Sequence, residues 1–546
     1  MNKLFNDLKI ELEDELKKFD INEKIEFISS KQIEFDLQIN NLVKHKKNKK
    51  FENLCDNLLK VLTNSNYFEN VEINSSGFIN LVFNFSELKN KITNTESDFE
   101  KDNKQNILLD YGGPNLGKPL HVGHIRTLNI GRSIYNTNTF VGNSVKSDIH
   151  LGDWGMPIAQ IISFIQTKGI DISTISAKDL ENIYPEANEK YRNDLEFKNI
   201  SQATNKQLNK KNDDVIEIWN AIKQLSLKNL EETFNLLNHR FDYWYGESDV
   251  NDLIEPMLND LQKRNVVELD DGALISTEET NPKILITKSD GSYLYITTDL
   301  ATVIFRNNNL KYDKALYIVD NRQSLHFKQL FRSINHFKLS TKEHIHVSYG
   351  TLNDSKGNPF KTREGGTKPL LELFHETKSY IQEINPKIDS KILEELTNSV
   401  LTFSDLLTNR KTDYKFDIEK FTNINGKTGI YVQYAYVRAL KLQKDFQKKD
   451  FNSTNLEINH IDKKLLTKLF MFFLELEKSI KLNEPHHLAE YLYEISNLFN
   501  SFYEKEKFSQ ITDTKKLSSK IYILNLFITT SQNVMNCLGV RPVSKM

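Results

Sequence analysis

Two histidines three residues apart, His121 and His124, have the spacing that most directly suggests chemistry in this chain. They follow a short apolar run at 107–109, which predicts a buried strand, and they precede apolar residues at a helical spacing. A strand-to-helix junction favours phosphate, because free backbone N–H groups and the helix dipole meet there. Gly123 lets a flat ligand approach the backbone. The stretch predicts a phosphate site; a capped helix with two incidental histidines is the structural alternative.

The composition limits the class of protein. The chain has 546 residues, too many for one hydrophobic core and enough for about three domains. Its net charge of −2 means that a nucleic acid would have to bind local basic patches. With only Cys55 and Cys537, a disulfide framework and a cysteine zinc site are both disfavoured. No signal-peptide core and no membrane-length apolar run is seen, so we expect a cytoplasmic protein.

The wider stretch around the histidines resembles a family signature. Residues 114–124 read Pro-Asn-Leu-Gly-Lys-Pro-Leu-His-Val-Gly-His, which is similar to the signature of class I aminoacyl-tRNA synthetases in the form used by arginyl-tRNA synthetases. The resemblance implies that His121, Gly123 and His124 bind ATP. The two histidines would hold the triphosphate and the developing charge, with His124 also near the amino acid. Lys118 would meet the pyrophosphate.

A second loop, 356–367, combines glycines with closely spaced cations, which suggests a mobile phosphate loop. Taken alone, the segment fits a solvated surface loop better. It resembles the second signature loop of the class I enzymes, but Thr362 replaces the second lysine of that loop. Arginyl enzymes often show this departure together with a lysine just before the first signature. Lys118, Lys361 and Arg363 are therefore candidates for neutralising pyrophosphate, and the choice among them stays open.

Further segments resemble those that line the arginine pocket of the family. A guanidinium is planar and permanently charged, so it needs a carboxylate in matching geometry. Asp299 and Asp110 would supply negative charge, Tyr295 a ring wall, and Asn115 and Gln323 amide groups. Gly113 stands where the family commonly has Ser or Ala, which puts one small substrate contact in doubt. The substrate-binding residues implied are Asp110, Gly113, Pro114, Asn115, His124, Tyr295, Asp299 and Gln323.

The elements that must position these residues alternate between strands and helices from about 106, which predicts a parallel sheet with crossover helices. Residues 145–149 and 317–319 are predicted as further strands of it. Residues 284–287 and 294–297 are predicted as strands around a type I′ turn at Asp290-Gly291. Roughly 180–265 is more helical and polar, an insertion with Trp219 and Trp244 as packing anchors.

Both flanking regions differ from this pattern. Residues 1–100 combine a leucine repeat at Leu4, Leu8, Leu12 and Leu16 with a hairpin at 71–83, and they resemble the N-terminal domain of the arginyl enzymes, which touches the tRNA body. The basic run 44–50 is expected to be a solvated face, with a phosphate contact as the alternative. Residues 426–546 carry apolar stripes typical of packed helices and resemble the anticodon-binding bundle.

Three smaller features belong to the C-terminal half. Residues 404–417 resemble the loop by which these enzymes meet tRNA, and the contacts implied are Asn409, Arg410, Lys411 and Tyr414. The shared face of Tyr431, Tyr434 and Arg438 is expected to be core packing or an interdomain seam. His486 and His487 are expected to be solvated or capping rather than metal ligands, because adjacent helical positions do not share a face.

The resemblance implies an α/β Rossmann-type catalytic domain with a parallel sheet at 101–425, an α+β domain at 1–100 and an all-α anticodon-binding bundle at 426–546. It implies a monomeric arginine–tRNA ligase that uses L-arginine, ATP with Mg²⁺ and tRNA(Arg), binds no membrane and has no protein-bound metal. The rivals are a synthetase for another amino acid and a non-catalytic tRNA-binding paralogue. Intact His121, Gly123, His124 and Lys361 speak against the paralogue.

Overall fold

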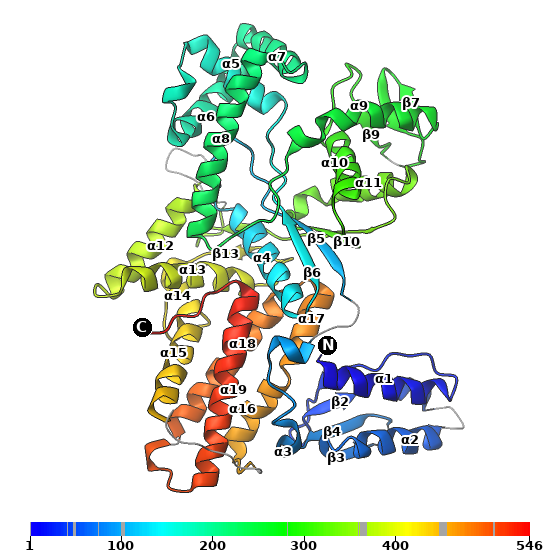
Figure 1. Cartoon of the computed structure of the whole chain (residues 1–546), viewed down its shortest axis with the longest axis vertical. Helices are drawn as coiled ribbons and strands as arrows, with labels where there is room; N and C mark the ends of the chain where they lie inside the picture. The colour runs from blue at the N-terminus through cyan, green and yellow to red at the C-terminus, as the bar shows by residue number, and fades with distance from the viewer. Residues whose placement is uncertain are drawn as a thin grey trace.

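The computed structural model divides into three parts, which Figure 1 shows in order of colour. It describes residues 2–546 except 41, 47–50, 75, 100–103, 281, 359, 361–367, 447–455 and 506–507. The N-terminal unit and the C-terminal helices lie beside each other below a central sheet, and two further lobes stand above it. Among the helices of these described residues, none is both long and apolar enough to cross a membrane.

The N-terminal unit packs helices against an antiparallel sheet of order β1-β2-β4-β3. Its predicted leucine face is confirmed, since Leu8, Leu12 and Leu16 are buried along the first helix. The predicted hairpin is the β3–β4 pair. The ring of Phe5 stacks on Phe473 of the C-terminal bundle with centroids 4.2 Å apart, which joins the two parts. The elements are α1 (Lys3–Lys17), β1 (Phe27–Ser29), β2 (Leu37–Ile39), α2 (Phe51–Asn64), β3 (Phe68–Ile73), β4 (Ile79–Phe83) and α3 (Phe85–Leu88).

The central sheet has four parallel strands in the order β11-β10-β5-β6, as the alternating pattern predicts. The chain runs from β5 outward to β6, and later returns to the other side of β5 to form β10 and β11. Neighbouring β5 and β10 are thus the place where the direction of winding reverses, which is where open α/β sheets bind ligands. The strands are β5 (Asn106–Asp110), β6 (Ser144–Asp148), β10 (Lys314–Tyr317) and β11 (Glu343–His346), with helices α4 (His124–Phe140) and α11 (Ser324–His336).

The prediction of a strand at 294–297 is wrong, because helix α10 (Tyr295–Asn309) begins there. The β-branched residues of this stretch favour a strand locally. In the structure, however, Ile296 and Leu300 are buried on one helical face. The Thr297 hydroxyl also accepts the backbone N–H of Leu294 at 3.1 Å, which satisfies one of the free donors at the helix start.

A small antiparallel sheet precedes this helix: β7 (Val267–Asp270), β8 (Ala273–Ser276) and β9 (Leu285–Thr287). The strand predicted at 284–287 is therefore confirmed. The turn after it is not of type I′, which needs positive φ at both central residues. Gly291 has a φ of +78°, whereas Asp290 is not in the positive-φ region.

Helices between residues 156 and 236 form a lobe above the sheet (Figure 1), and they include most of the segment predicted as a helical insertion, about 180–265. Trp219 donates its indole N–H to the backbone carbonyl of Asp153 at 2.7 Å, and its ring meets Trp154 edge to face. Trp244 packs against Phe234. Both tryptophans therefore act as the expected anchors. The helices of this lobe are α5 (Met156–Lys168), α6 (Ala177–Asn193), α7 (Leu195–Asn209) and α8 (Asp213–Leu236), whereas α9 (Glu247–Lys263) stands in the second lobe and packs against α10.

The C-terminal region is a helical bundle, and the predicted apolar stripes are its core. One stripe, from Leu466 to Ile480, crosses a break between two helices at Met471. The other, from Leu488 to Phe502, lies along one helix. The face of Tyr431 and Arg438 bonds to Asn500 within the same bundle, so it is packing inside the bundle. Between the sheet and the bundle lie β12 (Leu352–Asn353), α12 (Leu370–Ile384), α13 (Ser390–Leu407), β13 (Tyr414–Lys415) and α14 (Ile418–Phe421). The helices of the bundle are α15 (Gly429–Phe446), α16 (His460–Phe470), α17 (Phe472–Leu482), α18 (His486–Lys505) and α19 (Thr514–Leu538).

Candidate active site

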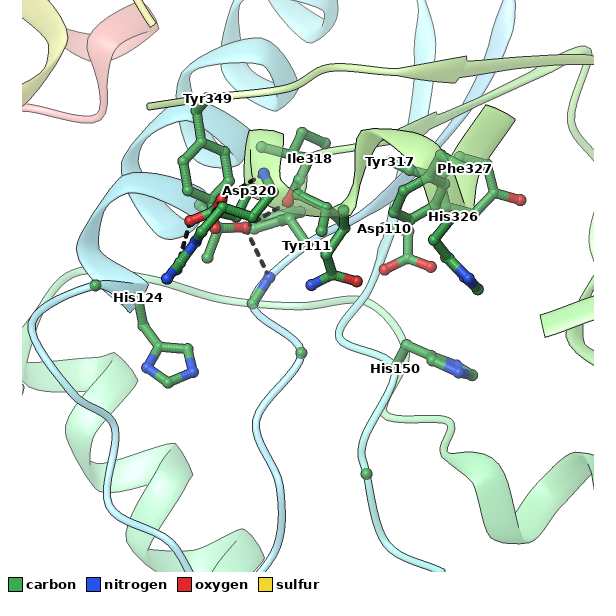
Figure 2. Close-up of a pocket in the computed structure, with 18 of the residues that line it drawn as sticks. Asp110, Tyr111, His124, His150, Tyr317, Ile318, Asp320, His326, Phe327 and Tyr349 are labelled. Carbon is green, nitrogen blue, oxygen red and sulfur yellow. Dashed lines mark hydrogen bonds and ion pairs between the residues drawn. The ribbon is translucent and has the colours of Figure 1, made fainter. Parts of the chain in front are cut away.

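A cavity of about 850 Å³ opens at the carboxyl ends of β5 and β10, and Figure 2 shows part of its lining. His124 lies at one side of it in this view, and Asp110 and His326 lie at the other. The predicted residues that line this cavity are Asp110, Gly113, Asn115, His121, Gly123, His124, Tyr295, Asp299 and Gln323. Residues as far apart in the sequence as Asp110 and Gln323 are thus brought together where the sheet topology predicts a ligand.

Not every predicted site residue lines the cavity. Pro114 is buried beside it, and its carbonyl accepts the Gly152 N–H at 3.0 Å. The ammonium of Lys118 lies 4.2 Å from the centre of the Tyr184 ring, on helix α6 of the insertion. Lys361 and Arg363 lie outside the described residues.

The histidine pair is rigidly held at the start of α4. The Nδ1 atom of His124 accepts the backbone N–H of His121 at 3.0 Å, and Nδ1 of His121 accepts that of Gly123 at 3.1 Å. A backbone N–H group can only donate, so Nδ1 of His121 accepts and the proton of its neutral ring is at Nε2. Nδ1 of His124 also lies 3.2 Å from the carbonyl oxygen of His121, so either tautomer of His124 finds a backbone partner. Burial lowers the pKa of His124 to about 3 and also lowers that of His121. Both rings are therefore neutral hydrogen-bond donors near pH 7.

Asp110 already has a partner inside the protein. Arg306, on α10, places Nη2 2.7 Å from Asp110 Oδ2 and 2.7 Å from Asp148 Oδ2. The guanidinium is only 1% exposed. Burial opposes its charge, but the two carboxylates hold the pKa of Arg306 above its usual range. The negative charge that Asp110 is predicted to supply is therefore shared with Arg306.

Asp299 is the more accessible carboxylate. It lies on the first turns of α10, and its Oδ2 is 2.6 Å from His326 Nε2 on α11. Its side chain is 29% exposed at the cavity. Tyr295, one turn earlier, is largely exposed and also lines the cavity. This side of the cavity thus offers a carboxylate and an open aromatic ring.

Glu247 is a cavity residue that the sequence did not indicate. It is the first residue of α9, at the end of the insertion. Its pKa is raised to about 7, mainly by burial; the charge of His150 opposes this rise, whereas the charges of Asp153 and Asp299 contribute to it. Glu247 and Asp299 therefore feel each other's charge, and a cation bound between them would favour ionisation of both.

Two glycines shape the loops around the substrate candidates. Gly113 has a φ of +44° and open space where a side chain would be, so the cavity is wider here than with Ser or Ala. Gly152 makes a bridge with Asn115 in the adjacent loop. A Cβ on Gly152 would overlap the side-chain oxygen of Asn115. Gly152 is thus required for the position of Asn115.

A buried network ties the start of α4 to the segment predicted to meet tRNA. Arg126, two residues after His124, pairs with Asp405 at 3.2 Å, and the two side chains are 1% and 0% exposed. It also donates to the Thr412 carbonyl at 2.9 Å and lies over the ring of Tyr414. Removing one member of such a buried pair leaves an uncompensated charge. The helix that carries His124 is therefore fixed to the 409–414 segment.

The four residues of this segment that were predicted to contact tRNA are not equally accessible. Arg410 and Tyr414 are buried, and Arg410 donates to backbone carbonyls of 482–483 at 2.8 and 3.4 Å. Their side chains pack within the protein. Lys411 is 60% exposed, and Asn409 is half-buried next to it. Only Asn409 and Lys411 are placed to reach an external phosphate.

The remaining functional candidates that sequence reasoning missed come from pairings across the fold. Arg306, Glu247, His326 and the pair Asp320–Arg322 all line the cavity. Arg322 bonds Asp320 through two nitrogens, at 2.9 and 2.7 Å. No local motif marks Arg306 or Glu247. A signal was available for Arg322 and His326, which belong to the run 321–326 that resembles a segment of the family's arginine pocket, and for Asp320 directly before it.

Comparison with known proteins agrees with this arrangement. Residues 87–418 match the model for tRNA synthetases class I (R), catalytic domain. Residues 432–546 match the DALR anticodon binding domain, and residues 6–83 match the arginyl tRNA synthetase N terminal domain.

Relatives and solved structures point the same way. An arginine–tRNA ligase of Alkaliphilus oremlandii is 32% identical over 530 residues, and one of Francisella tularensis is 30% identical over 526; each match covers 90% of both chains. The arginyl-tRNA synthetase of Plasmodium falciparum has a TM-score of 0.81 at 23% identity, covering 100% of both chains. That of Thermus thermophilus has a TM-score of 0.79 at 18% identity, covering 99% of this chain and 100% of the other. The two structures share the fold with this chain.

Proposed function

Because the chain belongs to the class I arginyl-tRNA synthetases, we propose that its central cavity activates L-arginine with ATP and that the arginyl group then passes to tRNA(Arg). The carboxylate of arginine attacks the α-phosphate of ATP and releases pyrophosphate. The terminal ribose hydroxyl of the tRNA, the 2′-OH by class resemblance, next attacks the acyl group of the adenylate. The observation that supports this assignment is one cavity with two neutral imidazoles at one side and accessible carboxylates at the other.

On the nucleotide side, His121 and His124 donate Nε2–H to phosphate oxygens and stabilise charge that develops on the α-phosphate. Phosphoryl chemistry needs positioning and charge stabilisation more than a covalent nucleophile. Two neutral donors satisfy this need without titrating near pH 7. Lys118, Lys361 and Arg363 neutralise the departing pyrophosphate. Mg²⁺ enters with ATP as part of the nucleotide substrate and takes its oxygen ligands mainly from phosphates and water.

On the amino-acid side, Asp299 binds the guanidinium of arginine, and Glu247 adds a second charge. A planar guanidinium presents paired N–H groups to a carboxylate, whereas the ammonium of lysine is a point charge. Tyr295 covers the alkyl chain, and Asn115 and Gln323 hold the α-amino and carboxylate groups. Asp110 acts mainly through Arg306, whose position it fixes.

The tRNA is bound outside this cavity. We propose that the N-terminal unit contacts its body, the C-terminal bundle its anticodon, and Asn409 and Lys411 its backbone. We further propose that the chain acts as a monomer in the cytoplasm.

ATP–pyrophosphate exchange with a panel of amino acids tests the proposal. Arginine is expected to support exchange, and the family resemblance predicts that tRNA(Arg) must be present. Activation of lysine or glutamine without arginine would assign the protein to another amino acid. An absence of exchange with every amino acid, together with retained tRNA binding, would support the non-catalytic paralogue.

The affinity for arginine is expected to decrease when the pH is lowered from 8 to 6, because Glu247 becomes protonated. Its pKa is raised to about 7 by burial, so the side chain is mostly ionised at pH 8 and mostly neutral at pH 6. Only the ionised form attracts the guanidinium. The KM for arginine should therefore rise up to about tenfold from pH 8 to pH 6, while the KM for ATP changes little. Glu247→Gln should have a high KM at both values; a wild-type KM independent of pH would remove Glu247 from the site.

Gly152→Ala is expected to weaken arginine binding by displacing Asn115. A Cβ at this position overlaps the Asn115 side-chain oxygen. Loss of one substrate hydrogen bond corresponds to roughly a tenfold rise in KM. Steady-state kinetics of Gly152→Ala, Asn115→Ala and the double variant measure this. If the two changes act through the same contact, the double variant is no worse than the more impaired single one; fully additive effects would contradict the mechanism.

A further inference from the structure

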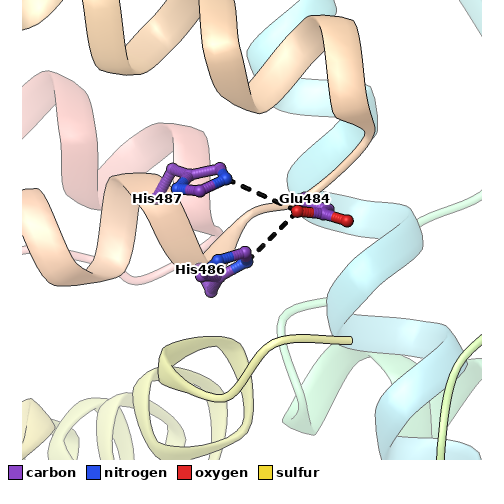
Figure 3. A group of neighbouring side chains, drawn as sticks. All are labelled: Glu484, His486 and His487. Carbon is purple, nitrogen blue, oxygen red and sulfur yellow. Dashed lines mark ion pairs between the residues drawn. The ribbon is translucent and has the colours of Figure 1, made fainter. Parts of the chain in front are cut away.

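Glu484, His486 and His487 form a compact cluster at the junction of α17 and α18, and none of the three lines the cavity (Figure 3). Both imidazole rings turn toward the carboxylate, and their centroids are 3.9 Å apart. The two histidine side chains are 11% exposed and that of Glu484 is 8% exposed. The expectation that the histidines are solvated is therefore wrong. Adjacent residues converge here because they begin a helix and fold back onto the preceding turn.

The donor atoms have the separation of a metal site. Glu484 Oε2 is 3.4 Å from His487 Nε2 and 4.0 Å from His486 Nδ1, and all three atoms lie within 4.8 Å of one another. In a tetrahedral zinc site with bonds of about 2.0–2.1 Å, the donor atoms lie about 3.4 Å apart. Small rotations of the side chains would bring the three atoms to that geometry.

Two of these donor atoms are buried and have no hydrogen-bond partner. His486 Nδ1 and His487 Nε2 are both in this state within the described part of the chain. Their nearest polar neighbour is Glu484 Oε2, at ion-pair distances of 3.4 Å from His487 Nε2 and 4.0 Å from His486 Nδ1. A metal ion placed among the three atoms would give both nitrogens a partner.

The charged residues around the cluster still leave one oxygen of Glu484 available to a metal ion. Lys411 bonds the other oxygen of Glu484, Oε1, at 2.9 Å, which leaves Oε2 facing the histidines. Arg410 is a second cation near Glu484. The N-terminal end of α18 and these cations oppose a metal ion, so the affinity will be lower than that of a buried three-ligand site without cations nearby.

We propose that Glu484, His486 and His487 bind one Zn²⁺ ion at the contact between the helical bundle and the 409–414 segment. Two imidazoles and one carboxylate are a donor set that suits zinc, with a water molecule as the fourth ligand. The site lies next to the carbonyls that accept from Arg410 and shares Glu484 with Lys411. Bound zinc therefore stabilises the contact between the bundle and the catalytic part.

Calorimetric titration of chelator-treated full-length protein with ZnCl₂ tests the proposal. The wild type is expected to bind one equivalent of zinc. The variant His486→Asn/His487→Asn should bind zinc more than about 100-fold more weakly, because losing a residue that only hydrogen-bonds to a metal ligand already lowers the affinity about 10- to 100-fold. A matched control, His375→Asn/His460→Asn, removes two exposed imidazoles elsewhere and should bind as the wild type does. Zinc should also raise the unfolding temperature of the wild type and control, but not of the double variant.

Co²⁺ provides a second measurement that needs no variant. In the wild type it should give the strong visible absorption of a four-coordinate site, and one equivalent of Zn²⁺ should abolish it. Binding with equal affinity by wild type and His486→Asn/His487→Asn would place the metal elsewhere and overturn the proposal. So would the absence of a stoichiometric zinc or cobalt signal in the wild type. Either result leaves the arginine–tRNA ligase assignment unaffected.

Discussion

His124→Ala is expected to lower the rate of tRNA charging by at least about 10²–10³-fold, the usual effect of removing one preorganised donor to developing charge. His124 begins α4, and its ring is fixed by the backbone of His121, so its Nε2 atom is held at constant geometry. Affinity for tRNA should stay within a few-fold, because this side chain lines the cavity and not the surfaces proposed to hold tRNA. Single-turnover charging and a filter-binding assay measure the two effects.

His239→Ala is a matched control for this variant. His239 is also buried, and its pKa is lowered by burial, but it does not line the cavity. Its replacement should leave the charging rate within a few-fold if the protein stays folded, which thermal unfolding checks. Charging by His124→Ala at a near wild-type rate would show that the catalytic assignment is wrong.

Asp299→Asn is expected to reduce kcat/KM for arginine roughly 30- to 4,000-fold. This range corresponds to the about 2–5 kcal/mol that the loss of one member of a desolvated charge pair costs. Asparagine keeps the size of the side chain and removes the charge that the guanidinium needs. The KM for ATP should change little, because Asp299 lies on α10, opposite the histidine pair. Steady-state exchange kinetics in the presence of tRNA separate the two parameters.

Asp110→Asn serves as the comparison for Asp299→Asn. Asp110 is bonded to Arg306, so its replacement should lower the thermal stability more and the arginine affinity less. If Asp110→Asn instead had much the larger effect on the KM for arginine, the guanidinium would lie against Asp110 and the present assignment would be wrong.

The parts of the fold that the sequence predicts are those with local causes. The apolar run before Asp110 and the helical spacing after His124 define β5 and α4, since burial and periodicity act over a few residues. The failure at 294–297 has the opposite origin. There β-branched side chains favour a strand locally, and burial of Ile296 and Leu300 against the rest of the protein favours a helix.

The residues of the cavity also fall into two groups, those that the sequence predicts and those that only the fold identifies. His121, Asp299 and Gln323 belong to segments with a recognisable pattern, and the fold brings them to one cavity. Arg306 and Glu247 could not be predicted, because their importance comes from partners distant in the sequence, such as Asp148 for Arg306 and Asp299 for Glu247. Knowledge of these partners changes the roles: Asp110 is largely occupied by Arg306, and Asp299 becomes the main arginine ligand proposed.

Charging of total tRNA with labelled amino acids tests whether this protein attaches arginine to tRNA(Arg). We expect the wild-type protein, with ATP, to transfer labelled arginine to acid-precipitable tRNA. The acceptor should be tRNA(Arg), and labelled lysine and glutamine should give no signal above background. Stable charging with another amino acid, or no charging with arginine by folded protein, would contradict this function.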